Sequence, residues 1–186
     1  KINVKYCTMT TSGTTALILS LMALMECPLK NRKQLHVGEC VIVPNYTMIA
    51  SINAIKHLGL TPVILDVNSS TFTLDIQTIR NCIKYDKEQK IKAVMHVSLN
   101  NRHSNIEEIA NYCNENELYL IEDAAQSLGC KSSTTGSFLG TYGDIGCYSL
   151  STPKIISSGQ GGIIVSNNIS LYETICKLKN FGRSCS

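Results

Sequence analysis

Two kinds of hydrophobic pattern alternate along the chain, and they predict alternating strands and helices. Short continuous apolar runs, typical of buried strands, occupy residues 5–9, 40–43, 62–66, 91–97, 118–122, 145–150 and 162–166. Between most of these runs, apolar residues recur every three or four positions, which is typical of helices. The predicted helices cover residues 12–24, 47–57, 75–83, 105–114 and 171–178.

This order of elements predicts the α/β class: a doubly wound, mainly parallel sheet with helices on both faces. Strands that are apolar throughout are typical of parallel sheets, because helices cover both of their faces. A chain of 186 residues is long enough for one domain with a well-buried core. In such sheets, ligands bind beyond the carboxyl ends of the strands, so the loops that follow the strands are where functional residues are expected.

Composition and charge exclude several classes of partner. The formal net charge of +3 comes from lysines and arginines scattered along the chain, without the basic and aromatic clusters of a nucleic-acid-binding surface. The apolar run over residues 16–25 is interrupted by Ser20 and is shorter than the roughly 20 residues that cross a membrane. It also lacks the flanks of a signal peptide, so we expect a cytoplasmic protein that binds neither nucleic acid nor a membrane.

The nine cysteines give no indication of a metal centre. They are dispersed, and no two of them form a C-x-x-C pair that would indicate a zinc site or a redox couple. Several fall within apolar segments, where a free cysteine behaves as a small hydrophobic residue. We therefore expect reduced thiols and no bound metal.

Hydroxyl groups are concentrated at the first predicted strand-to-helix turn, "TTSGTT" at residues 10–15. Backbone N–H groups and the helix dipole at such a turn favour an anion, and a phosphate is the obvious ligand. The alternative is an ordinary N-cap, in which Ser12 only terminates the helix. The turn lacks the P-loop pattern of nucleoside-triphosphate-binding proteins and the G-x-G-x-x-G of dinucleotide-binding proteins.

A pair of carboxylates, Glu122 and Asp123, ends the strand in "LYLIEDAAQ". Successive side chains of a strand point in opposite directions, so only one of the two should face the ligand. That carboxylate is a candidate base, metal ligand or partner for a cationic ring nitrogen. The alternative is an N-cap for a helix that starts at Ala124.

Lys154 follows the strand at residues 145–150 and precedes a loop rich in serine and glycine, "SLSTPKIISSGQGG". An isolated lysine here would be a solvated loop residue. A lysine held at a strand end can instead act as an amine that forms a Schiff base with an aldehyde. A phosphate cradle, a strand-end carboxylate and such a lysine are together what pyridoxal phosphate requires.

Four motifs in this order, "SGTTAL", "VIVPNYTMIASINAIKHLGLTPVILDV", "IEDAAQSLG" and "GDIGCYSLSTPKIISSGQGGIIVSN", resemble the DegT/DnrJ/StrS family of sugar aminotransferases. These enzymes use pyridoxal phosphate and share the fold of aspartate aminotransferase. The resemblance implies that Lys154 forms the Schiff base and moves the substrate proton, and that Asp123 pairs with the ring nitrogen. It also implies that Gln126 contacts the 3-oxygen of the ring.

Further cofactor contacts follow from the same resemblance. Gly13, Thr14 and Ser149 would bind the phosphate, and the glycine-rich loop after Lys154 would let the backbone approach the cofactor. Met48 stands where relatives usually have an aromatic residue that stacks on the ring, and Tyr46 is the nearest candidate to replace it. Residues 98–101 read Ser-Leu-Asn-Asn where relatives commonly read His-Leu-Tyr-Gly. Asparagine tolerates positive φ, so the turn is expected to persist.

The family's properties give expectations for the whole protein. Its members are roughly twice as long, so residues 1–186 are expected to form the central part of the large, cofactor-binding domain. The family's N-terminal segment and C-terminal small domain would then lie outside this chain. Family members are homodimers whose active sites borrow residues from the partner subunit.

The expected reaction transfers an amino group from glutamate to a nucleotide-linked keto-6-deoxysugar. The product would be a 4-amino-4,6-dideoxyhexose similar to perosamine or viosamine. Three alternatives stay open: a pyridoxal-phosphate-dependent sugar dehydratase, in which the lysine is replaced; a non-catalytic sensor or scaffold with this fold; and a nicotinamide-dependent oxidoreductase, which would need the absent glycine fingerprint.

Overall fold

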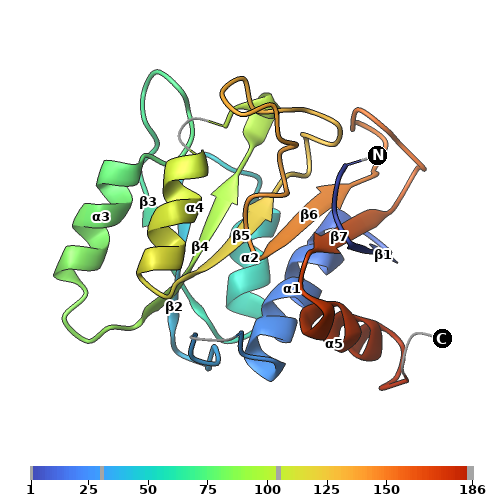
Figure 1. Cartoon of the computed structure of the whole chain (residues 1–186), viewed down its shortest axis with the longest axis horizontal. Coiled ribbons are helices and arrows are strands. Elements are labelled where there is room, and N and C mark those ends of the chain that lie inside the picture. The colour runs from blue at the N-terminus through green and yellow to red at the C-terminus, as the bar shows by residue number, and fades with distance from the viewer. Residues whose placement is uncertain (1, 30–31, 104–105, 184–186) are drawn as a thin grey trace.

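Seven strands form one sheet in the computed structural model, which describes residues 2–29, 32–103 and 106–183 (Figure 1). The strands are β1 (Tyr6–Thr10), β2 (Cys40–Pro44), β3 (Thr61–Leu65), β4 (Ile91–Val97), β5 (Tyr119–Asp123), β6 (Ile145–Ser149) and β7 (Gly162–Ser166). The helices are α1 (Gly13–Glu26), α2 (Ile49–His57), α3 (Ile76–Tyr85), α4 (Ile106–Glu115) and α5 (Ile169–Lys179), with a short 3-10 helix η1 (Leu99–Asn101).

The sheet has the order β1-β7-β6-β5-β4-β2-β3 and is mainly parallel, which confirms the predicted fold class. Strand β7 is the exception, since it runs antiparallel to both β1 and β6. Every predicted strand and helix is present, with described ends within two residues of the prediction. The predicted first residue of α4, Asn105, lies outside the described residues.

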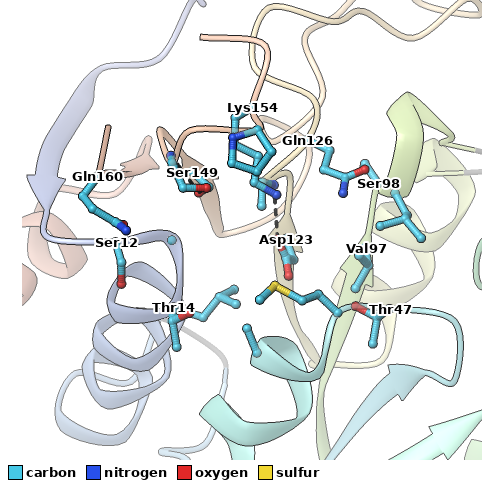
Figure 2. Close-up of a pocket in the computed structure, with 18 residues that line it drawn as sticks. Ser12, Thr14, Thr47, Val97, Ser98, Asp123, Gln126, Ser149, Lys154 and Gln160 are labelled. Atoms are coloured by element: carbon cyan, nitrogen blue, oxygen red, sulfur yellow. Dashed lines mark hydrogen bonds between the residues drawn. The ribbon is translucent and has the colours of Figure 1, made fainter. Parts of the chain in front are cut away.

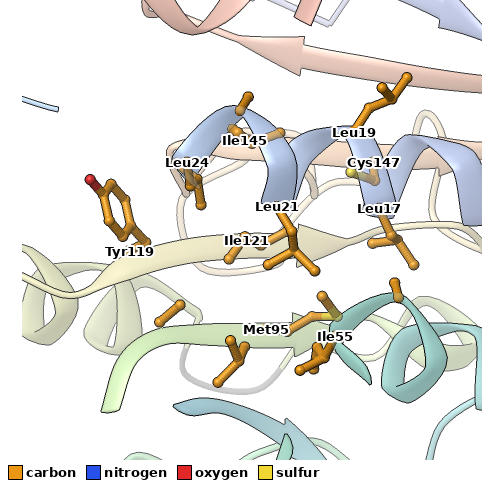
Figure 3. Packing of buried hydrophobic residues seen from close by; sticks show 14 of the residues in the cluster. Leu17, Leu19, Leu21, Leu24, Ile55, Met95, Tyr119, Ile121, Ile145 and Cys147 are labelled. Atoms are coloured by element: carbon orange, nitrogen blue, oxygen red, sulfur yellow. The ribbon is translucent and has the colours of Figure 1, made fainter. Parts of the chain in front are cut away.

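Helices cover both faces of the sheet because strand residues are apolar on both sides. On one face, Leu17 and Leu21 of α1 and Ile55 of α2 belong to one buried cluster with Met95 of β4 and Ile121 of β5 (Figure 3). The other face is covered by α3 and α4, whose contacts include Ile79 of α3, Ile106 of α4, Val94 of β4 and Leu120 of β5. Each fully buried side chain of this size contributes about 1.5–3 kcal/mol.

Strand direction brings the candidate residues to one edge of the sheet. Strands β2, β4, β5 and β6 pair in parallel, and β1 has the same direction because both β1 and β6 oppose β7. Their carboxyl ends therefore meet at one edge, together with the amino end of β7. The turn into α1, the end of β5 and the loop after β6 all lie there, as expected for this class of sheet.

The helices and cysteines of the described residues bear on two further expectations. No helix within the described residues is long and apolar enough to cross a membrane. Seven cysteines are free thiols, as expected: Cys7, Cys27, Cys40, Cys82, Cys113, Cys130 and Cys147. Cys176 is disulfide-bonded, so the expectation of reduced thiols is wrong for that residue.

Candidate functional site

A pocket of about 310 Å³ lies at the edge where these carboxyl ends meet (Figure 2). Its walls come from the turn before α1, the segment before α2, the ends of β4, β5 and β6, and the loop between β6 and β7. All seven residues that the family resemblance implies for the cofactor line this pocket: Gly13, Thr14, Met48, Asp123, Gln126, Ser149 and Lys154. Segments separated by more than a hundred residues thus form one site.

The amino end of α1 forms one wall of the pocket. Ser12 is the N-cap of α1, and its side chain accepts a hydrogen bond from the Thr15 backbone N–H at 3.0 Å. The N-cap alternative is therefore correct for Ser12, but the next residues, Gly13 and Thr14, line the pocket at the positive end of the helix. The same turn can thus cap the helix and present backbone N–H groups to an anion.

Gly13 allows this wall to approach the end of β6 closely. A Cβ atom on Gly13 would lie 2.8 Å from the Cβ of Ser149, closer than two carbon atoms pack. The Ser149 hydroxyl is consequently held beside the amino end of α1, and the Ser151 hydroxyl lies 3.1 Å from it. N–H groups and hydroxyls that converge from two elements have the donor chemistry that a phosphate needs.

Asp123 ends β5 at the base of the pocket, where only 5% of the residue is exposed. Its Oδ1 accepts the Ala125 backbone N–H at 3.1 Å, and its Oδ2 accepts the Ser51 hydroxyl at 2.7 Å. Burial raises the pKa of Asp123 above its ordinary value, while the Ser51 hydroxyl, the Ala125 N–H and the charge of Lys154 act to lower it. No helix begins at Ala124, since residues 124–130 form turns.

Glu122 points away from the pocket, as strand alternation predicts. Its carboxylate accepts the backbone N–H groups of Gly140, Tyr142 and Gly143 at 2.8, 2.6 and 2.7 Å. Burial raises the pKa of Glu122 to about 7, although these three N–H groups favour its charged form. Glu122 therefore holds the 140–143 loop against the sheet and takes no part in the pocket.

Gln126 is oriented by the 3-10 helix η1. The Asn100 backbone N–H donates to Gln126 Oε1 at 2.8 Å, which leaves the amide NH₂ of Gln126 as the donor for a ligand. Asn100 and Asn101 have φ values of 52° and 62°. The tight turn expected at the Ser-Leu-Asn-Asn sequence is therefore present, with asparagines in the left-handed region that they tolerate.

Lys154 lies in the loop between β6 and β7, on the same side of Asp123 as Ser149 and Gln126 (Figure 2). It is half-buried and lines the pocket, so its side chain is only partly exposed to solvent. Gln160, in the glycine-rich loop after Lys154, also lines the pocket. A Cβ on Gly162 would overlap the carbonyl oxygen of Ser12, so this glycine lets β7 approach the turn before α1.

Tyr46, the candidate to replace the aromatic residue that stacks on the ring in relatives, is not among the residues that line the pocket. Met48 lines the pocket and is 61% exposed, whereas the Tyr46 ring packs on Phe72 with ring centroids 5.7 Å apart. A thioether, not a ring, therefore covers this wall.

Sequence reasoning missed several polar residues of the site. Thr47 and Ser151 line the pocket, and Ser51 bonds Asp123 from beneath. The spacing of Thr47 and Ser51, four residues apart at the start of a predicted helix, was the sequence feature that could have indicated them.

Within residues 2–29, 32–103 and 106–183, no group of three or more His, Cys, Asp or Glu side chains could hold a metal ion.

Comparison with known proteins assigns the chain to a family. The sequence model of the DegT/DnrJ/EryC1/StrS aminotransferase family matches residues 1–185. The chain belongs to this family. A GDP-perosamine synthase of Escherichia coli O157:H7 is 36% identical over 97% of the chain. The chain spans only 45% of that relative, or about half of its length.

Solved structures with a family-like fold superpose closely on the chain. An aminotransferase from Psychrobacter cryohalolentis has a TM-score of 0.86 and 30% identity, covering 98% of the chain and 43% of its own. A GDP-4-keto-6-deoxymannose-3-dehydratase described with a trapped PLP-glutamate geminal diamine has a TM-score of 0.85 and 25% identity, covering 97% of the chain and 45% of its own. Solved structures with two different named activities therefore share the fold of this chain.

Proposed function

We propose that this chain carries the cofactor site of a pyridoxal-phosphate-dependent aminotransferase that transfers an amino group from glutamate to a nucleotide-linked keto-6-deoxysugar. One observation carries the proposal: all seven residues that the family resemblance implies for the cofactor line a single pocket. Membership of the DegT/DnrJ/EryC1/StrS family supports it. Cytoplasmic location stays a prediction.

The residues present fit pyridoxal phosphate. Gly13 and Thr14 at the amino end of α1, with the Ser149 hydroxyl, would hold the phosphate. Asp123 would accept a hydrogen bond from the protonated ring nitrogen, and the Gln126 amide NH₂ would donate one to the 3-oxygen. The Gly13 cradle, which a Cβ would fill, is a structural sign of a built site. Met48 and Val97, which also line the pocket, would pack against the apolar faces of the ring.

The chain's own residues would then perform three tasks. Bound pyridoxal phosphate supplies an aldehyde carbon and an electron-withdrawing ring. Lys154 Nζ would tether the cofactor and, once free, accept and return a proton next to the amino nitrogen of the substrate. The Asp123 carboxylate would keep a positive charge on the ring nitrogen, and the dipole of α1 would fix the phosphate so that the ring turns about a constant anchor.

Relatives suggest the substrates and the assembly of the whole protein. The name GDP-perosamine synthase favours a nucleotide-linked keto-6-deoxysugar aminated at carbon 4, and the similar dehydratase structure holds glutamate joined to the cofactor as a geminal diamine. We infer that residues 1–186 form the central part of the large domain.

Met48 and Ile49 are 61% and 59% exposed beside the pocket. A second copy of the protein, in a homodimer, would cover them.

Lys154 favours the aminotransferase over the dehydratase alternative, because the resemblance implies that dehydratases replace this lysine. The oxidoreductase alternative lacks its glycine fingerprint. A non-catalytic scaffold would need none of the converging polar side chains that surround Asp123.

The test records the visible spectrum of the protein with pyridoxal phosphate, and then adds glutamate alone. It uses the 186-residue chain and a chimera in which the chain replaces the matching 45% of the Escherichia coli relative. We expect a Schiff-base band that glutamate removes as 2-oxoglutarate forms, and no band in Lys154→Ala. Absence of the band in both proteins would contradict cofactor binding, and a band that glutamate leaves unchanged would contradict the amino donor.

A further inference from the structure

The Asp123 carboxylate is held by a hydroxyl from another element, Ser51 in the first turn of α2. Ser51 is fully buried, and its Oγ donates to Asp123 Oδ2 at 2.7 Å. Ser51 does not line the pocket, so it reaches a bound ligand only through Asp123. A buried hydroxyl bonded to the carboxylate that closes a ligand pocket acts on the chemistry of that carboxylate.

A second hydroxyl supports the first. Thr47 Oγ1 lies 2.9 Å from Ser51 Oγ, and each hydroxyl has a single hydrogen to donate. Because Ser51 directs its hydrogen to Asp123, Thr47 is the donor to Ser51. Two hydroxyls aligned in this direction polarise each other and strengthen the bond to the carboxylate. The alignment requires an unprotonated Asp123 Oδ2.

We propose that Ser51 is a positioning residue that fixes the Asp123 carboxylate, ionised and in one orientation, as the acceptor for a protonated ring nitrogen in the pocket. The inference rests on the proposed function, because that ring nitrogen belongs to pyridoxal phosphate. Through Ser51, and through Thr47 just before it, the amino end of α2 would orient Asp123.

The electrostatics of Asp123 explain why the carboxylate needs this support. Burial disfavours a charged carboxylate and raises the pKa of Asp123. Among the groups that oppose this effect, the Ser51 hydroxyl ranks first, ahead of the Ala125 N–H and Lys154. The amino end of α2 adds a favourable dipole, since Ser51 belongs to its first turn. Without Ser51, the neutral carboxyl would become more favourable.

The geometry also leaves room for the ligand. An ionised carboxylate has about four acceptor positions. Asp123 uses one on Oδ1 for the Ala125 N–H and one on Oδ2 for Ser51. The remaining positions include the side that faces the pocket. With both oxygens tied, the carboxylate cannot rotate, so a ring N–H meets an acceptor that is already oriented.

The experiment compares Ser51→Ala with Ser51→Thr, which keeps the hydroxyl. Ser20→Ala is the matched control, because Ser20 is also a fully buried helical serine, but its hydroxyl contacts the Cys147 sulfur. Each variant is made in whichever of the chain and the chimera shows the cofactor band. The readouts are the dissociation constant of pyridoxal phosphate and the ¹⁵N NMR signal of cofactor labelled at the ring nitrogen, recorded against pH. Circular dichroism checks that each variant is folded.

We expect Ser51→Ala to raise the dissociation constant about tenfold. The pH at which the ring nitrogen loses its proton should fall by about one unit, because the carboxylate partner is less well stabilised as an anion. Ser51→Thr and Ser20→Ala should both match the parent protein in these readouts.

Two outcomes overturn the inference while leaving the proposed function intact. In the first, Ser51→Ala matches a parent that binds the cofactor normally. In the second, Ser51→Ala and Ser20→Ala weaken binding equally with no change in the ¹⁵N titration, so that the hydroxyl only supports the fold. If Ser51→Ala does not fold, a changed titration in Ser51→Thr would equally contradict the inference. A parent that shows no cofactor band overturns the proposed function and the inference together.

Discussion

The two consecutive carboxylates at the end of β5, Glu122 and Asp123, point to opposite sides of the strand and receive different hydrogen-bond donors. Glu122 receives three backbone N–H groups from the 140–143 loop, whereas Asp123 faces the pocket and receives one N–H and the Ser51 hydroxyl. Strand alternation predicted that only one of them would face a ligand, and the family resemblance indicated which. The bond from Ser51 was not predictable, because it joins two elements whose residues lie 72 positions apart in the sequence.

The contact between Gly13 and Ser149 gives a prediction for a single residue. Gly13→Ala places a Cβ within 2.8 Å of the Ser149 Cβ and forces α1 away from β6. Crowding of this kind costs about 1–3 kcal/mol, so we expect pyridoxal phosphate to bind about tenfold more weakly or worse. Titration of the cofactor by absorbance measures this effect. Thr11→Ala, an exposed change in the same turn, is the control, and equal binding by Gly13→Ala and the parent would contradict the role of the close approach.

At the scale of elements, the order of strands and helices was predictable because each buried strand is a continuous apolar run. The direction of β7 was not predictable, since an apolar run such as residues 162–166 reads the same in either direction. The turn at Asn100 and Asn101 was expected from the tolerance of asparagine for positive φ, and both residues adopt it. Its bond to Gln126 was not expected, because it joins η1 to the loop after β5.

The neighbouring strands β4 and β5 predict a dependence of stability on pH. His96 of β4 pairs in register with Glu122 and is fully buried, and neither of its ring nitrogens has a hydrogen-bond partner among the residues that the structure describes. Burial, with a smaller effect of His103, lowers the pKa of His96 to about 4. Because this pKa is lowered, the contribution of neutral His96 to the stability of the fold is fully present above pH 6.5, the ordinary pKa. That contribution is lost as the pH falls towards 4.

His96→Leu removes this titration and leaves Glu122 unchanged. We expect the unfolding free energy of the parent, minus that of the variant, to fall by about 3 kcal/mol between pH 6.5 and pH 4. Burial of Glu122 has the opposite dependence, because its pKa is raised to about 7, but it contributes equally to both proteins and cancels. Urea unfolding at several pH values measures the difference, and a difference that does not change with pH would contradict the account.

At the scale of the whole molecule, the parallel sheet explains why residues scattered from Gly13 to Lys154 share one pocket. Each comes from the carboxyl end of a strand or from the turn that follows it, and parallel strands bring those ends to one edge. The apolar side chains of Met48 and Ile49 stay exposed beside this edge. The chain spans 45% of the GDP-perosamine synthase that it resembles, so the activity and assembly of the whole protein stay proposals.

The most direct test of the central claim is to find which lysine the cofactor modifies. The protein is incubated with pyridoxal phosphate, reduced with borohydride, digested and analysed by mass spectrometry. Reduction fixes a Schiff base as a stable bond, so we predict one dominant modified peptide that contains Lys154, and its loss in Lys154→Arg. Modification spread over several surface lysines, or an unchanged pattern in Lys154→Arg, would contradict the claim that this pocket binds the cofactor through Lys154.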